Sequence, residues 1–192
     1  VRVWGEEVSA FDMGPIAAQW MSDFLGRKLR LVRFDPDHRR VSSLRWTGGV
    51  EALNQFSDGY ALLVLSQASV DELNTRLAAA GHAAVGVERF RPNLVLDGVE
   101  SHDEDRLPEL SIALGDGRHA QLQLVKPCAR CPIPNIDPVS GVSSPHVGDM
   151  LQTYRQDPRL DGACTFGMNA IVRSGVDGVL RTGQTVQGNY RF

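Results

Sequence analysis

Two cysteines and an arginine lie close together in the segment Cys128-Ala129-Arg130-Cys131. A thiolate is a nucleophile and a soft metal ligand, and a neighbouring cation favours the ionised thiol. Because prolines restrict the backbone on both sides, we expect these cysteines on a loop of defined shape that follows a strand. The residue types therefore predict a reactive or metal-binding loop, flanked by Pro127, Pro132 and Pro134.

Several interpretations of this motif are open from the residues alone. A structural zinc site requires four ligands, and the sequence has no second CxxC pair to complete one. A thioredoxin-like dithiol requires the motif at the start of a helix, whereas prolines follow it here. Two incidental buried thiols are a further alternative. Arg130 is either a bidentate ligand for phosphate or another oxyanion, or an ordinary surface arginine.

Two other segments could take part in ligand binding. In Arg89-Phe90-Arg91-Pro92-Asn93, Arg91 could hold an anion, and Asn93 could offer a donor and an acceptor to a heterocycle. The alternative is a strand edge that carries charges. Ser57 and Asp58 precede Gly59 in either an ordinary turn or a ligand-binding loop. The sequence contains no P-loop, GxGxxG, GxSxG or HExxH motif.

The elements that would position these residues are mostly short strands. Residues 61–65 are continuously apolar and predict a buried strand, and 110–114 with 120–125 alternate around a Gly-rich turn and predict a hairpin. Ser69 and Glu72 form a capping box that predicts a helix over 70–80. The acidic segment 97–109 is expected to be a solvated loop. Further strands are expected at 2–4, 29–34, 93–96, 169–172, 179–180 and 185–186, and further helices at 15–25 and 147–156.

This pattern predicts an α+β fold that is mainly β, with a barrel-like mixed sheet and a few packed helices. A chain of 192 residues with 42% apolar and 22% charged residues suits one globular domain, residues 1–192. The net charge of −3 argues against nucleic acid or an anionic membrane as a partner. The sequence has no run of about 18 apolar residues, so it predicts no membrane span. An odd number of cysteines, 3, favours a reducing, cytoplasmic location.

Taken in chain order, these segments resemble the MOSC domain, a molybdenum-cofactor family that includes the mitochondrial amidoxime reducing component and its bacterial relatives. The resemblance covers nearly the whole chain. Its most specific parts are the RFRPN segment at 89–93 and the CxRC segment with its Asp137-Pro138 pair. The other matching segments lie at 14–31, 57–74, 154–155 and 166–169.

The resemblance implies a role for each candidate residue. Cys131 matches the position whose thiolate ligates molybdenum, and Cys128 would be a neighbour of the metal. Asp58 would lie beside the pocket with Ser57 and is a candidate general acid. The positions expected near the pterin and its phosphate are Arg91, Asn93 and Arg130.

The implied activity is that of a molybdenum-cofactor (molybdopterin) oxidoreductase that reduces small N-hydroxylated compounds by two electrons. The electrons would come from a separate ferredoxin-, flavin- or haem-type protein. An alternative is a sulfur carrier that uses Cys131 as a persulfide-accepting thiolate, or a cofactor-binding module without reductase activity. Family members usually have a β-rich domain upstream of this region. We therefore expect the chain, which starts at Val1, to be part of a longer protein with a partly open site.

Overall fold

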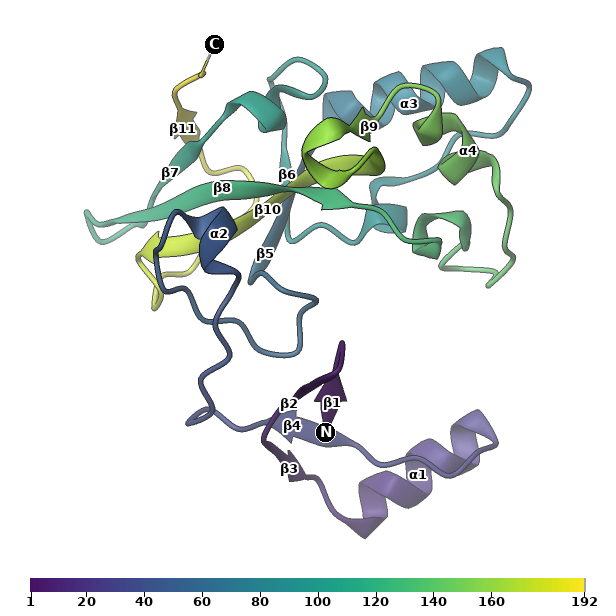
Figure 1. Cartoon of the computed structure of the whole chain (residues 1–192), viewed down its shortest axis with the longest axis vertical. Coiled ribbons are helices and arrows are strands. Elements are labelled where there is room, and N and C mark those ends of the chain that lie inside the picture. Colours follow the sequence, from purple (N-terminus) through teal and green to yellow (C-terminus); the bar gives the residue numbers. More distant parts are fainter. Residues whose placement is uncertain (192) are drawn as a thin grey trace.

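The computed structural model describes residues 1–191. Its main body is a seven-stranded mixed sheet that curls into a half-barrel, with helices packed outside it (Figure 1). The architecture confirms the predicted mainly β fold with packed helices. The strands of the sheet are β5 (Leu62–Ser66), β6 (Leu94–Leu96), β7 (Glu109–Ala113), β8 (His119–Ala129), β9 (Gln156–Asp157), β10 (Ala163–Ser174) and β11 (Val186–Gly188).

The strand order is β11-β7-β8-β10-β5-β6, and β9 pairs with one end of β10. The helices around this sheet are α2 (Leu44–Thr47), α3 (Gln67–Ala79) and α4 (His146–Gln152), with 3-10 turns η1 (Val87–Phe90), η2 (Asp103–Arg106), η3 (Ile133–Asn135) and η4 (Pro158–Leu160). The predicted hairpin is confirmed as β7 and β8. However, β8 continues to Ala129 because β10 pairs with its other edge, so Cys128 lies on a strand and not on the predicted loop.

The sheet is buried on both faces, which explains the continuous apolar run of β5. Val64 points into a cluster inside the half-barrel, together with Leu122 and Met168. Leu65 points to the opposite face, into a second cluster formed with α3 and α4. A strand that contributes to two cores has no polar face, so its sequence does not alternate.

A glycine bulge in β10 bends the centre of this sheet. The register between β10 and β8 shifts between Thr165 and Met168, which leaves one extra residue on β10. Gly167 lies in this bulge with φ +79°, and an added Cβ would lie 2.8 Å from the Val64 carbonyl oxygen. Only glycine meets both requirements without strain.

Helix α3 begins earlier than the capping box predicts. Its N-cap is Ser66, whose hydroxyl accepts a hydrogen bond from the Ser69 N–H at 3.1 Å. The Ser69 hydroxyl instead donates to Glu104 at 2.8 Å. The predicted start was therefore wrong by one turn, because a distant carboxylate decides which serine caps the helix.

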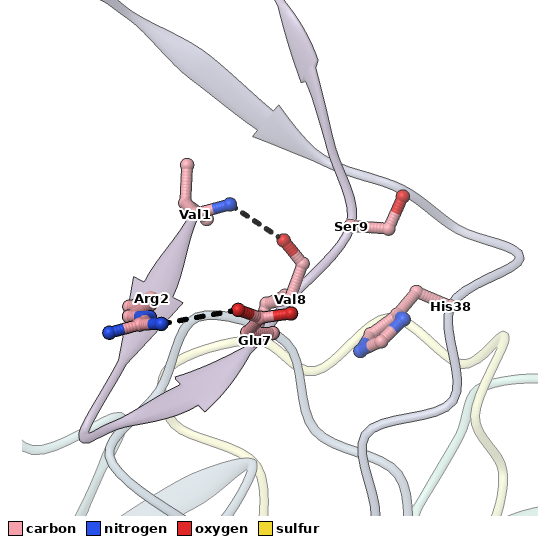
Figure 2. Close-up of a pocket in the computed structure, with 6 residues that line it drawn as sticks. All are labelled: Val1, Arg2, Glu7, Val8, Ser9 and His38. Atoms are coloured by element: carbon pink, nitrogen blue, oxygen red, sulfur yellow. Dashed lines mark hydrogen bonds and ion pairs between the residues drawn. The ribbon is translucent and has the colours of Figure 1, made fainter.

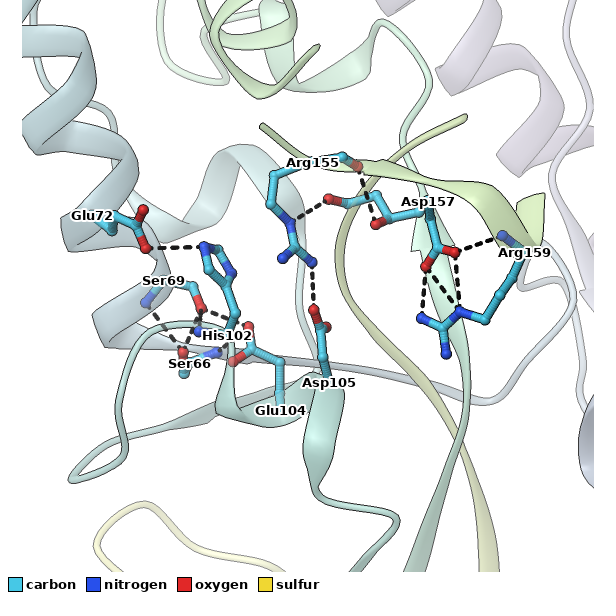
Figure 3. A network of polar contacts seen from close by, with 10 residues as sticks. Ser66, Ser69, Glu72, His102, Glu104, Asp105, Arg155, Asp157 and Arg159 are labelled. Atoms are coloured by element: carbon cyan, nitrogen blue, oxygen red, sulfur yellow. Dashed lines mark hydrogen bonds and ion pairs between the residues drawn. The ribbon is translucent and has the colours of Figure 1, made fainter. Parts of the chain in front are cut away.

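The prediction that the acidic segment is a solvated loop was also wrong. Asp103 and Glu104 lie on η2, and Glu104 is 0% exposed. One Glu104 oxygen accepts from both the Ser66 N–H and the Ser69 hydroxyl (Figure 3). These donors offset part of the cost of burying this carboxylate, and no periodicity in the sequence signals them.

A polar network extends from this point across the packed elements (Figure 3). His102 Nε2 lies 3.1 Å from a Glu72 carboxylate oxygen. Arg155 donates to Asp105 at 2.6 Å and to the Thr165 carbonyl at 3.1 Å. Burial lowers the pKa of His102 below 6.5, and the positive charge of Arg155 acts in the same direction. His102 is therefore held as a neutral imidazole.

Residues 1–34 form a small lobe beside the sheet (Figure 1). Helix α1 confirms the helix predicted over 15–25: it begins at Pro15 and ends before Gly26. Its apolar stripe is not a core: Trp20 is 64% and Phe24 75% exposed, with their rings stacked at 5.5 Å. The elements of this lobe are β1 (Arg2–Val3), β2 (Glu6–Glu7), β3 (Ala10–Asp12), α1 (Pro15–Leu25) and β4 (Val32–Phe34).

Two further features lie near the ends of the chain. The predicted strand at 179–180 is absent from the described residues, because Leu180 packs on the inner cluster without strand pairing. At the other end, a cavity of about 570 Å³ lies in the small lobe (Figure 2). The charges there are paired, Arg2 with Glu7 and the Val1 ammonium with the Val8 carbonyl. None of the residues predicted to form the site lines this cavity.

We expect Gly167→Ala to lower the free energy of unfolding by about 1–3 kcal/mol, because the new Cβ meets both positive φ and a backbone oxygen. Gly162→Ala is the control: its φ is +77° but no atom lies within 4 Å. That variant should lose only about 1 kcal/mol. Urea denaturation measures both, and equal losses would contradict the close-contact argument.

The His102 pKa predicts a specific pH dependence. Above pH 6.5 the histidine is neutral in both the folded and the unfolded chain. As the pH falls below 6.5, the unfolded chain binds a proton that the folded chain does not, so stability is lost. His102→Asn, which suits the positive φ of 63°, should flatten this slope between pH 6.5 and 5 in denaturation experiments. An unchanged slope would contradict the assignment.

Candidate functional site

One cavity of about 360 Å³ brings all the predicted site residues together. They come from the loop before β5, the turn between η1 and β6, and the end of β8 with the residues after it. Asn169 of β10 also lines the cavity. The six residues are Ser57, Asp58, Arg91, Asn93, Arg130 and Cys131.

The two cysteines of the CxRC segment differ in their surroundings. Cys131 is exposed, whereas Cys128 is half-buried and accepts a hydrogen bond from Arg130 Nη1 at 3.1 Å. The Arg130 guanidinium also donates to the Phe90 carbonyl at 3.0 Å and lies over the Phe90 ring. Its Nε is buried without a partner among residues 1–191. Arg130 thus stabilises the wall of the cavity and leaves the Cys131 thiol accessible.

The backbone of Arg130 is fixed by the strand beside it. Its N–H donates to the Cys164 carbonyl of β10 at 2.8 Å. Cys164 is the third free thiol, buried in the cluster under α3 and α4, and burial raises its pKa. This thiol is unsuited to a role in the open cavity.

The residues after the motif are held by a carboxylate. Asp137 accepts from the backbone N–H groups of Ser140 at 2.8 Å and Val139 at 2.9 Å, and from Arg89 at 2.9 Å. The backbone donors, Ser140 first, and then Arg89 hold the pKa of Asp137 below its ordinary value. Arg89 of the RFRPN segment therefore fixes the CxRC loop and does not face the cavity as a free cation.

Arg91 and Asn93 follow the same short helix. Arg91 ends η1 in the left-handed conformation, with φ 55°, which is strained for a side chain of this size. Its guanidinium is exposed and forms no ion pair within residues 1–191. Asn93 Oδ1 accepts from the Leu63 N–H at 2.8 Å, which fixes the side chain and leaves its amide NH₂ and a second lone pair of Oδ1 for a ligand. That Asn93 offers a donor and an acceptor to a heterocycle stays a prediction.

Sequence reasoning missed the residue that shapes the Ser57–Asp58 loop. Arg40, which is 4% exposed, donates to the carbonyls of Ser57 and Asp58 and to Asn54 Oδ1 at 2.6 Å. Its Nε donates to Glu6 of β2 at 2.7 Å. No motif in the sequence marks Arg40, and an arginine outside a motif is normally solvated.

The small lobe also reaches the site through Trp4, which sequence reasoning did not select. The Trp4 indole N–H donates to Asp58 Oδ1 at 2.9 Å. Trp4 lies at the tip of the β1–β2 hairpin, where both Trp4 and Gly5 have positive φ. This turn places an aromatic ring beside a carboxylate that is distant in sequence.

The donor set fits an anionic ligand that contains a soft metal. An accessible thiol, an unpaired guanidinium and the orphaned Nε of Arg130 face or line one cavity. Thiolates select soft metals, and guanidinium groups bind phosphate. The volume lies within the range of about 300–1,000 Å³ that is usual for small-ligand sites.

We expect Arg40→Met to lower the free energy of unfolding by about 3 kcal/mol, because several buried acceptors lose their donor. Arg39→Met is the matched control, since the neighbouring Arg39 forms only an exposed ion pair with Glu51. That change should cost less than about 1 kcal/mol. Chemical denaturation compares the two, and similar costs would contradict the role of Arg40.

Comparisons with known proteins show the family of this chain. The MOSC domain model matches residues 52–187. Mitochondrial amidoxime-reducing component 1 of Mus musculus is 38% identical over 158 residues, which cover 80% of this chain and 44% of the mouse protein. The Homo sapiens protein of that name is 36% identical over 82% of this chain and 45% of its own length. The chain thus spans less than half of these relatives.

Two further comparisons are more distant. Mitochondrial amidoxime reducing component 2 of Rattus norvegicus is 30% identical over 96% of this chain and 55% of its own length. The crystal structure of YiiM from Geobacillus stearothermophilus superposes with a TM-score of 0.41 and 14% identity, over 69% of this chain and 55% of that one. The family model covers well over half of the 192 residues. The chain therefore belongs to the MOSC domain family.

Proposed function

We propose that this chain is a molybdenum-cofactor-binding oxidoreductase domain that reduces small N-hydroxylated compounds. The observation that supports it is the meeting of six separately predicted residues in one cavity around an exposed thiol. Family membership and relatives named for amidoxime reduction point to the same chemistry. In this reaction the N–O bond breaks, two electrons and two protons are taken up, and one water is released.

The cofactor would be held by groups that have no other partner within residues 1–191. The Cys131 thiolate would ligate the metal, and the free Arg91 guanidinium would bind an anionic group. The Asn93 NH₂ and Arg130 Nε would supply further donors. When bound, the cofactor would supply the two-electron chemistry, and the protein would bind and orient it.

Asp58 is the proposed proton donor. Its carboxylate is exposed at the cavity, and the Trp4 indole occupies one oxygen, which leaves the other available to a substrate. Arg40 donates to the backbone carbonyls of Ser57 and Asp58 and so holds the loop that carries this carboxylate. A hydroxyl leaving as water requires a proton, and a carboxylic acid can deliver it.

The electrons would come from a separate ferredoxin-, flavin- or haem-type protein. No helix within residues 1–191 is long and apolar enough to cross a membrane. A cytoplasmic location and the upstream domain expected from the resemblance both stay predictions.

An alternative function is sulfur transfer by Cys131 as a persulfide carrier. The exposure of the Cys131 thiol supports it. The two functions differ in what protects Cys131: a metal ligand resists alkylation only when molybdenum is present, whereas a carrier thiol is alkylated in the purified protein.

We expect Cys131→Ser to abolish molybdenum binding, because a hydroxyl is a poor substitute for a soft thiolate. Molybdenum and zinc per chain are measured by mass spectrometry on protein from a host that makes the cofactor. Cys128→Ser is the control, since Cys128 lies in the wall and should leave most of the metal bound. Equal molybdenum content in the parent and Cys131→Ser would contradict the proposal, and zinc in the parent would indicate a structural metal site.

A further inference from the structure

A second cavity of about 520 Å³ adjoins the first. Asp58, Tyr60, Cys128 and Asn169 line both, so a ligand in one is adjacent to a ligand in the other. The residues that line only the second cavity differ in chemistry: they include two aromatic and two basic side chains, Trp4, Trp46, Arg40 and Lys126, together with Glu6.

Lys126 is the one cation in this cavity that has no ion pair within residues 1–191. Its ammonium lies 5.8 Å from the centre of the Trp46 ring and 5.9 Å from that of Tyr60, and it forms no ion pair. Arg40, the other cation, is paired with Glu6, whereas the Asp58 carboxylate accepts from the neutral Trp4 indole and has no ion pair within residues 1–191. Aromatic faces stabilise a half-buried ammonium only in part, so an anion in the cavity would be attracted to it.

The aromatic wall is held in place by its own contacts. Trp46 lies on α2, where the fully buried Thr47 donates to the Val50 carbonyl at 2.6 Å. Burial raises the pKa of Tyr60, although a hydrogen bond with Ser43 acts against this. Two rings that are fixed beside a cation form a site for a planar ring that bears a negative charge.

We propose that this second cavity is the substrate site, and that it selects aromatic N-hydroxylated compounds that carry an anionic group. Lys126 pairs with the anionic group, and Trp46 with Tyr60 contacts the ring. The shared residues then place the N-hydroxyl end beside Asp58 and the Cys131 cavity. The inference rests on the proposed reductase function, and it adds the substrate class.

The test compares two probes that differ only in charge: an aryl amidoxime with a para-carboxylate and the same amidoxime with a neutral para-carboxamide. Binding to the purified chain without cofactor is measured by calorimetry, so that the result does not depend on turnover. We expect the carboxylate to bind about tenfold more tightly than the carboxamide. Raised salt should reduce this preference.

Variants assign the preference to its residues. Lys126→Gln should remove most of the tenfold preference without weakening the binding of the carboxamide probe. Lys126→Arg should retain the preference. Lys28→Gln is the matched control, because Lys28 is the other of the two lysines and lies in the small lobe. Trp46→Leu should weaken both probes several-fold. Equal binding of the two probes, or an equal effect of Lys28→Gln, would overturn the inference.

The cofactor-loaded protein separates this inference from the proposed function. If Lys126→Gln lowers molybdenum content, Lys126 holds the cofactor and the substrate inference fails. If the parent reduces both amidoximes at equal kcat/KM, the function stands and the inference fails. If the parent binds the carboxylate selectively but reduces neither probe, the reductase function fails and the anionic aromatic site remains.

Discussion

The fold depends on the position of β10 between β5 and β8. This strand pairs with both neighbours, receives β9 at one end and contributes side chains to both hydrophobic clusters. The Gly167 bulge lets it bend while Phe166 and Met168 still enter opposite cores. Because the three motif segments join or flank these strands, the curvature of β10 decides where the cavity walls meet.

The site is rigid although most of its residues lie on loops. Three side chains make hydrogen bonds that replace the strand pairing that loops lack. Arg40 donates to the 54–58 segment, Asp137 accepts from the residues after Cys131, and the Asn93 side chain accepts from β5. Each contact satisfies backbone groups that would otherwise need water. Cys131 and Arg91, whose side chains have no polar partner among residues 1–191, are thereby left to a ligand.

Signals that are local in sequence predicted the fold well. The β7–β8 hairpin follows from alternation around a Gly-rich turn, and the sheet from many short strands. The start of α3 could not be predicted, because Glu104 selects between two serines from 35 or more residues away. The site followed from motif resemblance, whereas Arg40 and Trp4 did not, since their partners Glu6 and Asp58 lie 34 and 54 residues distant.

The three free thiols lie at three depths, with Cys131 exposed, Cys128 half-buried and Cys164 buried beneath the helices. A thiol-specific reagent therefore reacts with them at different rates, because a buried thiol reacts only after local unfolding exposes it. The labelling rates of these thiols therefore report separately on different parts of the structure. The slow labelling rate of Cys164 measures how often β10 separates from α3 and α4. The fast labelling rate of Cys131 reports on the cavity in the folded protein.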